Sequence, residues 1–202
     1  GKFTIVDPGD PKPVHDYIKE TGLELSEILL THHHWDHSGG VEELVSEYNC
    51  LAYGPAGDHI KGITNPVRDK ESVNILEDIE FIAFSAPGHT NDQLSYFSDK
   101  TIDPILFSGD TLFSAGCGRV FEGTPKEMLY SMDAYHELPK DTRVYCGQEY
   151  TESNLKFALA VEPGNEHIKT KIKEVDILRQ SNKPSLPSIL GIEMKINPFM
   201  RC

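Results

Sequence analysis

The sequence is poor in basic residues, has few cysteines and contains no long apolar run. Its 202 residues include 19 Lys and Arg against 32 Asp and Glu, so the formal net charge is −13 with histidine neutral. A nucleic-acid-binding protein needs a basic face that neutralises phosphates, and this charge balance argues against one. We therefore expect no nucleic-acid partner.

The same absences bear on compartment and membrane association. No stretch of about 18 apolar residues is present, so no membrane contact is expected. The chain opens GKFTIVDPGD, without the basic and apolar segments of a signal peptide. Its four cysteines lie far apart and form no CxxC pair, which is typical of a reduced intracellular protein. The sequence predicts a cytoplasmic monomer, with a mitochondrial location as the alternative.

Short apolar segments that end in polar or glycine-containing loops recur up to about residue 150. Strands are predicted at residues 3–6, 28–30, 51–53, 80–85, 94–98, 105–108 and 143–146. A helix is predicted between Asp10 and Gly22, another over VEELVSEY, and a third at 125–138, where Thr124 and Glu127 form a capping box. This alternation predicts an α/β domain over residues 1–150.

The character of the chain changes after residue 150, because strand signals disappear. Helices are predicted at 154–161 and 166–179, and prolines at 184, 187 and 198 predict irregular structure beyond Asn182. Residues 151–202 are therefore interpreted as a smaller, mainly helical C-terminal region.

Histidine is concentrated at one point, directly after the predicted strand at 28–30. Four of the nine histidines lie within THHHWDHSGG at residues 31–40, and His32, His34, Asp36 and His37 form an HxHxDH pattern. Imidazole nitrogens and carboxylate oxygens are ligands for zinc, iron and manganese. If the loop is extended, residues 32, 34 and 36 project to one side while His33 and His37 turn away. A polar surface loop is the alternative; a purification tag would be terminal and would contain no Trp or Asp.

Two further candidate ligands follow other predicted strands. His89 lies in APGHT and Asp110 in SGDT. Alone, each has an ordinary explanation, since such a histidine often forms a capping hydrogen bond and such an aspartate an Asx turn. Together with the histidine loop they form a candidate metal site.

These motifs, with FSGDTLFSAGCGRVFEGT, RVYCGQEYT, NLKFALAVEPGN and NPFMR, resemble the glyoxalase II (hydroxyacylglutathione hydrolase) family of the metallo-β-lactamase superfamily. The resemblance extends from about Ile5 to the last residue. It implies an α/β fold, an αββα sandwich with a metal site at one end of its sheets, followed by a helical region that helps to hold glutathione. It also implies hydrolysis of glutathione thioesters, such as S-lactoylglutathione, to a 2-hydroxy acid and glutathione.

The resemblance also implies roles for individual residues. A first metal would be held by His32, His34 and His89, a second by Asp36 and His37, and Asp110 would bridge the two. Zinc is the expected metal, and one or two ions per chain are expected; iron and manganese are also compatible with these ligands. Asp36 and Asp110 would act as the catalytic residues that position the attacking water.

The chain departs from the family at one expected ligand. The family has histidine in CGHEYT, and this chain has Gln148. An amide oxygen is a weaker donor than imidazole, so we predict that the second metal binds weakly or not at all. The alternative is that Gln148 only fills space beside a working two-metal site.

Three residues are predicted to bind the substrate. Arg119 is suited to a glutathione carboxylate, Phe121 offers packing where some family members have tyrosine, and Tyr150 offers a hydroxyl unless it is a core aromatic residue. The chain starts without methionine and stops before the basic C-terminal residues of longer family members. We therefore expect a truncated or divergent form with weak substrate binding.

Two other functions remain open at this stage. One is a mononuclear iron glutathione-persulfide dioxygenase, for which His32, His89 and Asp110 would supply a two-histidine, one-carboxylate set. The other is a catalytically inactive homologue that binds metal or glutathione. GCGRVFEGT and the helical tail favour the hydrolase.

Overall fold

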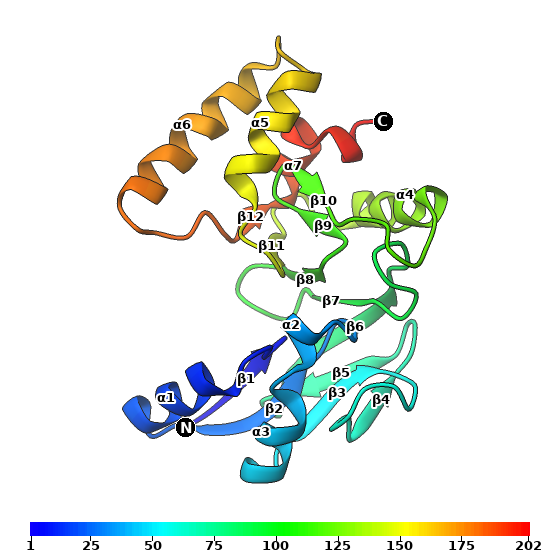
Figure 1. Ribbon diagram of the computed structural model, residues 1–202, viewed down its shortest axis with the longest axis vertical. Coiled ribbons are helices and arrows are strands. Elements are labelled where there is room, and N and C mark those ends of the chain that lie inside the picture. Colours follow the sequence, from blue (N-terminus) through cyan, green and yellow to red (C-terminus); the bar gives the residue numbers. More distant parts are fainter.

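The computed structural model describes all 202 residues, and it has two β-sheets that pack face to face (Figure 1). The first sheet contains the parallel strands β1 (Lys2–Val6), β2 (Glu24–Leu29), β3 (Leu51–Pro55) and β4 (Asn65–Val67), in that order. Two helices connect its strands, α1 (Pro11–Thr21) between β1 and β2 and α3 (Val41–Tyr48) between β2 and β3. The one-turn helix α2 (Trp35–Ser38) precedes α3.

The second sheet is mixed and has the strand order β12-β11-β8-β7-β6-β5. Its strands are β5 (Ser72–Ile75), β6 (Ile79–Ser85), β7 (Leu94–Ser98), β8 (Ile105–Gly109), β11 (Arg143–Cys146) and β12 (Ser188–Ile189). Strands β5 to β8 form an antiparallel meander, and β11 is parallel to β8. A small hairpin of β9 (Leu112–Phe113) and β10 (Gly116–Cys117) follows β8.

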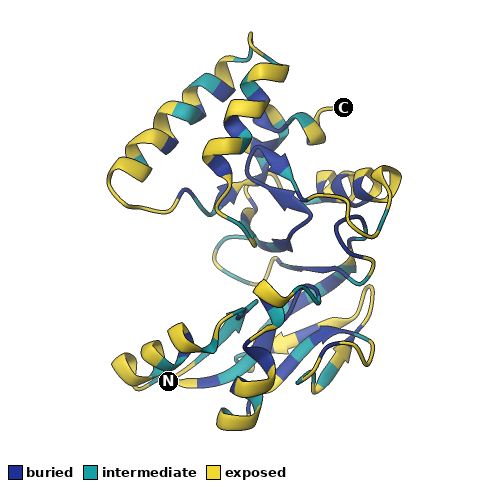
Figure 2. Cartoon of the chain, viewed as in Figure 1, coloured by how far each residue is buried: buried dark blue, intermediate teal, exposed yellow.

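Side-chain alternation along the strands creates the layers. In and just after β2, Ile28 and Leu30 pack against α1 and α3, whereas Leu29 packs between the two sheets. The opposite sheet is covered by α4 (Pro125–Ala134), whose Met128 and Met132 are buried against it. The central strands β2, β7 and β8 are largely buried, whereas the edge strands and the outer faces of the helices are partly exposed (Figure 2). The expected αββα sandwich is confirmed.

Local sequence signals set most helix ends correctly. Asp10 caps α1 by accepting a hydrogen bond from the Lys12 backbone, and Gly22 ends it in the left-handed conformation. The predicted capping box of Thr124 and Glu127 is present at the start of α4. The predicted helix at 125–138 was too long, because α4 ends at Ala134 and continues only as a 3-10 turn, Tyr135–Glu137.

The C-terminal region contains α5 (Thr151–Val161), α6 (Glu166–Gln180), α7 (Leu190–Ile196) and a 3-10 turn, Pro198–Met200. The prediction that residues beyond Asn182 are irregular was wrong. Pro184 and Pro187 lie in the connection before β12, and Pro198 begins the final 3-10 turn, so none interrupts α7.

Because β12 pairs with β11, this region adds a strand to the sandwich. The proposed boundary at residue 150 falls just before α5. No helix has the length and apolar character needed to span a membrane.

A buried carboxylate attaches α7 to the rest of the molecule. Glu193 is fully buried and accepts hydrogen bonds from Ser114 Oγ at 2.9 Å, the Ala115 backbone at 2.7 Å, and Ser188 Oγ. Burial raises the pKa of Glu193, and these hydrogen bonds oppose that change. The carboxylate therefore joins α7, β12 and the β9–β10 hairpin at one point.

Replacing Glu193 with alanine should lower the free energy of unfolding by about 2–5 kcal/mol, because buried donors on Ser114 and Ala115 would lose their acceptor. Denaturant unfolding of Glu193→Ala and of the exposed control Glu20→Ala measures the difference. Equal unfolding free energies for the two variants would contradict this role for Glu193.

Candidate metal centre

The candidate ligands meet at one edge of the sandwich. The histidine loop follows β2, His89 follows β6, Asp110 follows β8, and Gln148 follows β11. Strands β6, β8 and β11 run in the same direction, because β7 is antiparallel to both β6 and β8, and β11 is parallel to β8. Their carboxyl ends therefore present side chains to the same place.

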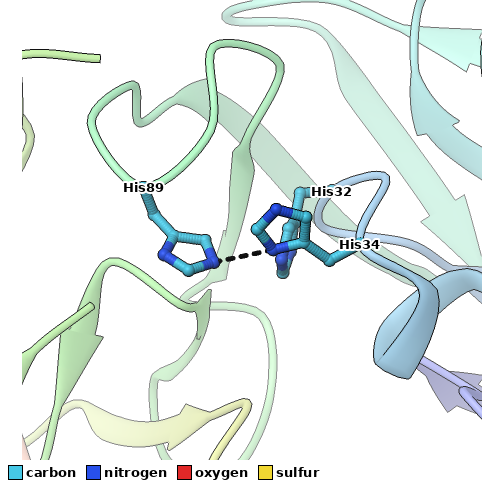
Figure 3. A group of neighbouring side chains, drawn as sticks. All are labelled: His32, His34 and His89. Atoms are coloured by element: carbon cyan, nitrogen blue, oxygen red, sulfur yellow. Dashed lines mark hydrogen bonds between the residues drawn. The ribbon is translucent and has the colours of Figure 1, made fainter. Parts of the chain in front are cut away.

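Three imidazoles form the centre of the site (Figure 3). One coordinating nitrogen from each of His32, His34 and His89 lies within 4.8 Å of the others. His89 Nε2 is 2.9 Å from His34 Nδ1, a separation that requires a proton or a cation between the two nitrogens. The sequence prediction that these three side chains converge is what the structure shows.

The hydrogen bonds behind the rings determine which nitrogens face inward. The His89 Nδ1 group donates to the Arg119 carbonyl at 2.8 Å, so its Nε2 carries the lone pair. Thr31 donates its hydroxyl proton to Asp7 and accepts from His32 Nδ1 at 3.0 Å, so the lone pair of His32 also lies on Nε2. That atom is buried without any hydrogen-bond partner. A buried, unpartnered nitrogen aimed at two other imidazoles fits a metal ligand.

Asp110 lies between the triad and His37. Its Oδ2 is 3.5 Å from His89 Nε2, and its Oδ1 is 3.4 Å from His37 Nε2. Asp110 Oδ1 is buried and has no hydrogen-bond donor. This position between two groups of ligands is the one that a bridging carboxylate needs.

Asp7 supports the site from behind and was not identified from the sequence. Its carboxylate accepts hydrogen bonds from the Thr31 backbone at 2.7 Å and from His37 Nδ1 at 2.9 Å. Asp7 adopts a positive φ of 50°, which is uncommon for a non-glycine residue. The only sequence signal was the turn DPGD, which does not reveal a contact with residues 31 and 37.

The electrostatics around His37 favour a positive charge. Burial would lower the pKa of this imidazole, but the neighbouring Asp110 and Asp7 carboxylates raise it to about 10. In contrast, burial and the surrounding imidazoles lower the pKa of His32 far below its usual value. The site therefore combines neutral nitrogen donors with carboxylates that attract a cation, which is the donor set that a divalent metal requires.

The local backbone differs from the extended loop assumed for HxHxDH. Residues 35–38 form α2, so Asp36 and His37 project from a helical turn rather than from an alternating strand. Asp36 Oδ2 is 3.5 Å from His37 Nε2, and both face the same side of the site. The expectation that His37 turns away from Asp36 was therefore wrong.

Gln148 contacts these two residues through its amide nitrogen. Gln148 Nε2 donates to Asp36 Oδ2 at 2.9 Å and lies 3.2 Å from His37 Nε2. An amide nitrogen has no free lone pair for a metal, and turning the amide over would place its oxygen against the Asp36 carboxylate. The amide thus stands between the two groups expected to hold a second metal.

Close glycine contacts leave room for Asp110. A Cβ atom on Gly118 would lie 1.8 Å from the Asp110 carbonyl oxygen, and one on Gly147 would lie 2.4 Å from Asp110 Oδ1. A side chain at Gly118 would displace the Asp110 backbone, and one at Gly147 would displace the Asp110 carboxylate. Gly118 in GCGR and Gly147 in CGQE are therefore needed for Asp110 to occupy its position in the site.

A cavity of about 540 Å³ opens beside the triad. The three predicted substrate-binding residues, Arg119, Phe121 and Tyr150, all line it, as do His34, Asp36, His89 and Asp110. Tyr150 is 52% exposed, so the alternative that it is a core aromatic residue is not supported. Phe121 meets the edges of the His34 and His89 rings, which places an apolar surface next to the candidate metal.

Comparisons with known proteins identify the family. The family model described as metallo-beta-lactamase superfamily matches residues 1–147, and that of the hydroxyacylglutathione hydrolase C-terminus matches residues 149–202. Hydroxyacylglutathione hydrolase of Pseudoalteromonas translucida is 48% identical over 198 residues, which are 98% of this chain and 75% of that protein. Hydroxyacylglutathione hydrolase of Pseudomonas putida is 46% identical over 201 residues, which are 99% of this chain and 77% of that protein.

A solved structure agrees on the fold and on the presence of metal in a similar protein. TTHA1623 in a di-iron-bound form aligns with a TM-score of 0.65 and 26% identity, and the alignment covers 96% of this chain and 87% of that one. With its sandwich fold, its histidine-rich centre and these relatives, the chain belongs to the hydroxyacylglutathione hydrolase family of the metallo-β-lactamase superfamily.

Proposed function

We propose that this chain hydrolyses glutathione thioesters of the S-lactoylglutathione type, with the help of a metal held by His32, His34, His89 and Asp110. The buried, unpartnered His32 Nε2 is the observation that carries the metal proposal. The names of the curated relatives support the substrate class. Neither the persulfide dioxygenase nor the inactive homologue has comparable support.

Zinc is the metal we propose, because imidazole nitrogen and carboxylate oxygen suit it. The same ligands suit iron, which the similar di-iron structure contains. When bound, such a metal lowers the pKa of water from 15.7 to about 7 and polarises carbonyl oxygens.

The residues of the chain would orient the water and the acyl group. Asp110 and Asp36 line the cavity, and their carboxylates would accept hydrogen bonds from the attacking water. The water oxygen bonds to the thioester carbon, the carbon–sulfur bond breaks, and the electron pair leaves with sulfur. A thiol of pKa about 8.5 departs as the thiolate without an obligatory proton donor. The proton released from water passes to the solvent or to that thiolate.

The cavity suggests how a glutathione moiety would bind. Arg119 supplies a cation at its rim, which would attract a glutathione carboxylate even though the chain has a net charge of −13. Tyr150 would donate to the peptide part of the substrate, and Phe121 would pack beside the acyl group.

Zinc-loaded protein should release thiol from S-lactoylglutathione, and Asp110→Asn should reduce kcat/KM at least about 100-fold, because the variant loses the bridging charge. Thiol release is measured with a chromogenic disulfide, and Asp176→Asn on the exposed face of α6 serves as the control. An Asp110→Asn variant within threefold of wild type would contradict the proposed site. Sulfite production from glutathione persulfide in place of thioester hydrolysis would contradict the proposed reaction.

Asp7→Ala should weaken metal binding about 10–100-fold, because His37 and Thr31 would lose the carboxylate that orients them. Competition with a zinc chelator measures the affinity, and the control is Asp99→Ala, an exposed aspartate after β7 at the opposite edge of the second sheet. Unchanged zinc affinity in Asp7→Ala would show that Asp7 has no orienting role.

Gln148→His should raise the zinc content after dialysis from about one to about two ions per chain. The imidazole would replace an amide nitrogen that cannot bind metal and would complete a set with Asp36 and His37. Elemental analysis gives the content, and Gln180→His on exposed α6 controls for an added surface histidine. Two tightly held ions in the unmodified protein would refute the prediction.

A further inference from the structure

A second group of ligand-type side chains lies beside the metal centre, and the proposed reaction does not use it. His33 Nδ1 is 2.9 Å from Asp92 Oδ1, and His59 Nε2 is 2.8 Å from Asp92 Oδ2. One coordinating atom from each of these residues lies within 4.8 Å of the others. The alternation of an extended loop predicts that His33 turns away from the triad.

Three separate loops bring these residues together. His33 follows β2, His59 lies between β3 and β4, and Asp92 lies between β6 and β7. Residues that are 33 and 59 positions apart in the sequence thus meet at one point. Local hydrogen bonding within one turn does not account for such a cluster.

A carboxylate lies near each of the two ring nitrogens of His33. Its Nδ1 faces Asp92, and its Nε2 lies 3.2 Å from Glu122 Oε1. When the Nε2–H group donates to Glu122, Nδ1 is the nitrogen that is free to bind a cation together with Asp92. A carboxylate on the far nitrogen is also the usual support of a metal-binding histidine.

The degree of exposure suits a cation that exchanges with solvent. The side chain of Asp92 is 13% exposed, that of His33 is 30% exposed and that of His59 is 45% exposed. The Asp92 carboxylate is thus the least exposed of the three groups, and the His59 imidazole is the one that faces solvent most. By contrast, another surface cluster, His15 with Glu43 and Glu47, has one imidazole and two glutamates that are more than half exposed.

We propose that His33, Asp92 and His59 form an outer site for a borderline divalent cation such as zinc, separate from the triad of His32, His34 and His89. Two imidazole nitrogens and one carboxylate oxygen are a ligand set that zinc accepts, with water completing the coordination. Glu122 would hold the His33 ring in place by accepting from Nε2. The ring centroids of His33 and His34 are 5.0 Å apart, so the outer site lies directly beside the candidate metal centre.

Zinc titration of zinc-loaded protein by calorimetry tests the outer site. Wild type should take up one more ion per chain than His59→Ala, or should bind that ion at least about tenfold more tightly. His59 is exposed, so the variant should fold normally. His15→Ala removes a histidine from the competing surface cluster and should behave as wild type. Asp92→Asn keeps the side-chain shape and should show the same loss as His59→Ala.

A crystal soaked in zinc provides the direct readout. Anomalous density should appear about 2.0–2.1 Å from His33 Nδ1 and His59 Nε2. Equal zinc uptake by wild type, His59→Ala and Asp92→Asn, or no density between these residues at millimolar zinc, would overturn the proposal. The titration measures binding alone, so a failure of thioester hydrolysis would leave its result intact.

Discussion

The candidate metal centre depends on hydrogen bonds that hold three of its four histidine rings, those of His32, His37 and His89, from behind. Asp7 occupies Nδ1 of His37, the Thr31 hydroxyl occupies Nδ1 of His32, and the Arg119 carbonyl occupies Nδ1 of His89. Because a neutral imidazole has one donor and one acceptor, the contacts behind His32 and His89 place a lone pair on the inner nitrogen of each ring. His37 instead has a carboxylate near both of its nitrogens, which favours its charged form. The ligand geometry thus exists before any metal arrives, and binding does not have to pay the conformational entropy of ordering three side chains.

The layers of the fold could be predicted because their signals are local. Alternation separates Leu29 from Ile28 and Leu30, and capping residues mark the ends of α1 and α4. The tail could not be predicted in the same way. Its α7 has seven residues, and it is stabilised by tertiary contacts of Glu193 rather than by helix propensity.

The site residues also fall into two groups, those that local sequence motifs predict and those that only the folded chain brings together. The HxHxDH spacing identified His32 and His34, and position after a strand identified His89 and Asp110, because these signals lie in contiguous residues. No such signal marks Asp7, Asp92 or His59. Each contacts the site through a hydrogen bond to a residue more than 20 positions away in the sequence. Gln148 could be located from its motif, but the direction of its amide depends on Asp36, which only the folded chain brings near.

The C-terminal region reaches the metal centre through the β9–β10 hairpin. Asn197 donates to the carbonyls of Phe113 and Gly116 at 3.1 and 2.8 Å, and Glu193 accepts from Ser114 and Ala115 between them. This hairpin leads directly into Gly118, which packs against Asp110, and into Arg119, whose carbonyl orients His89.

A shift of α7 would therefore move a ligand support and a proposed substrate contact together. The two parts of the chain that match separate family models are joined here by the hydrogen bonds of Glu193 and Asn197. The C-terminal region and the candidate metal centre therefore share one segment, the seven residues from Phe113 to Arg119.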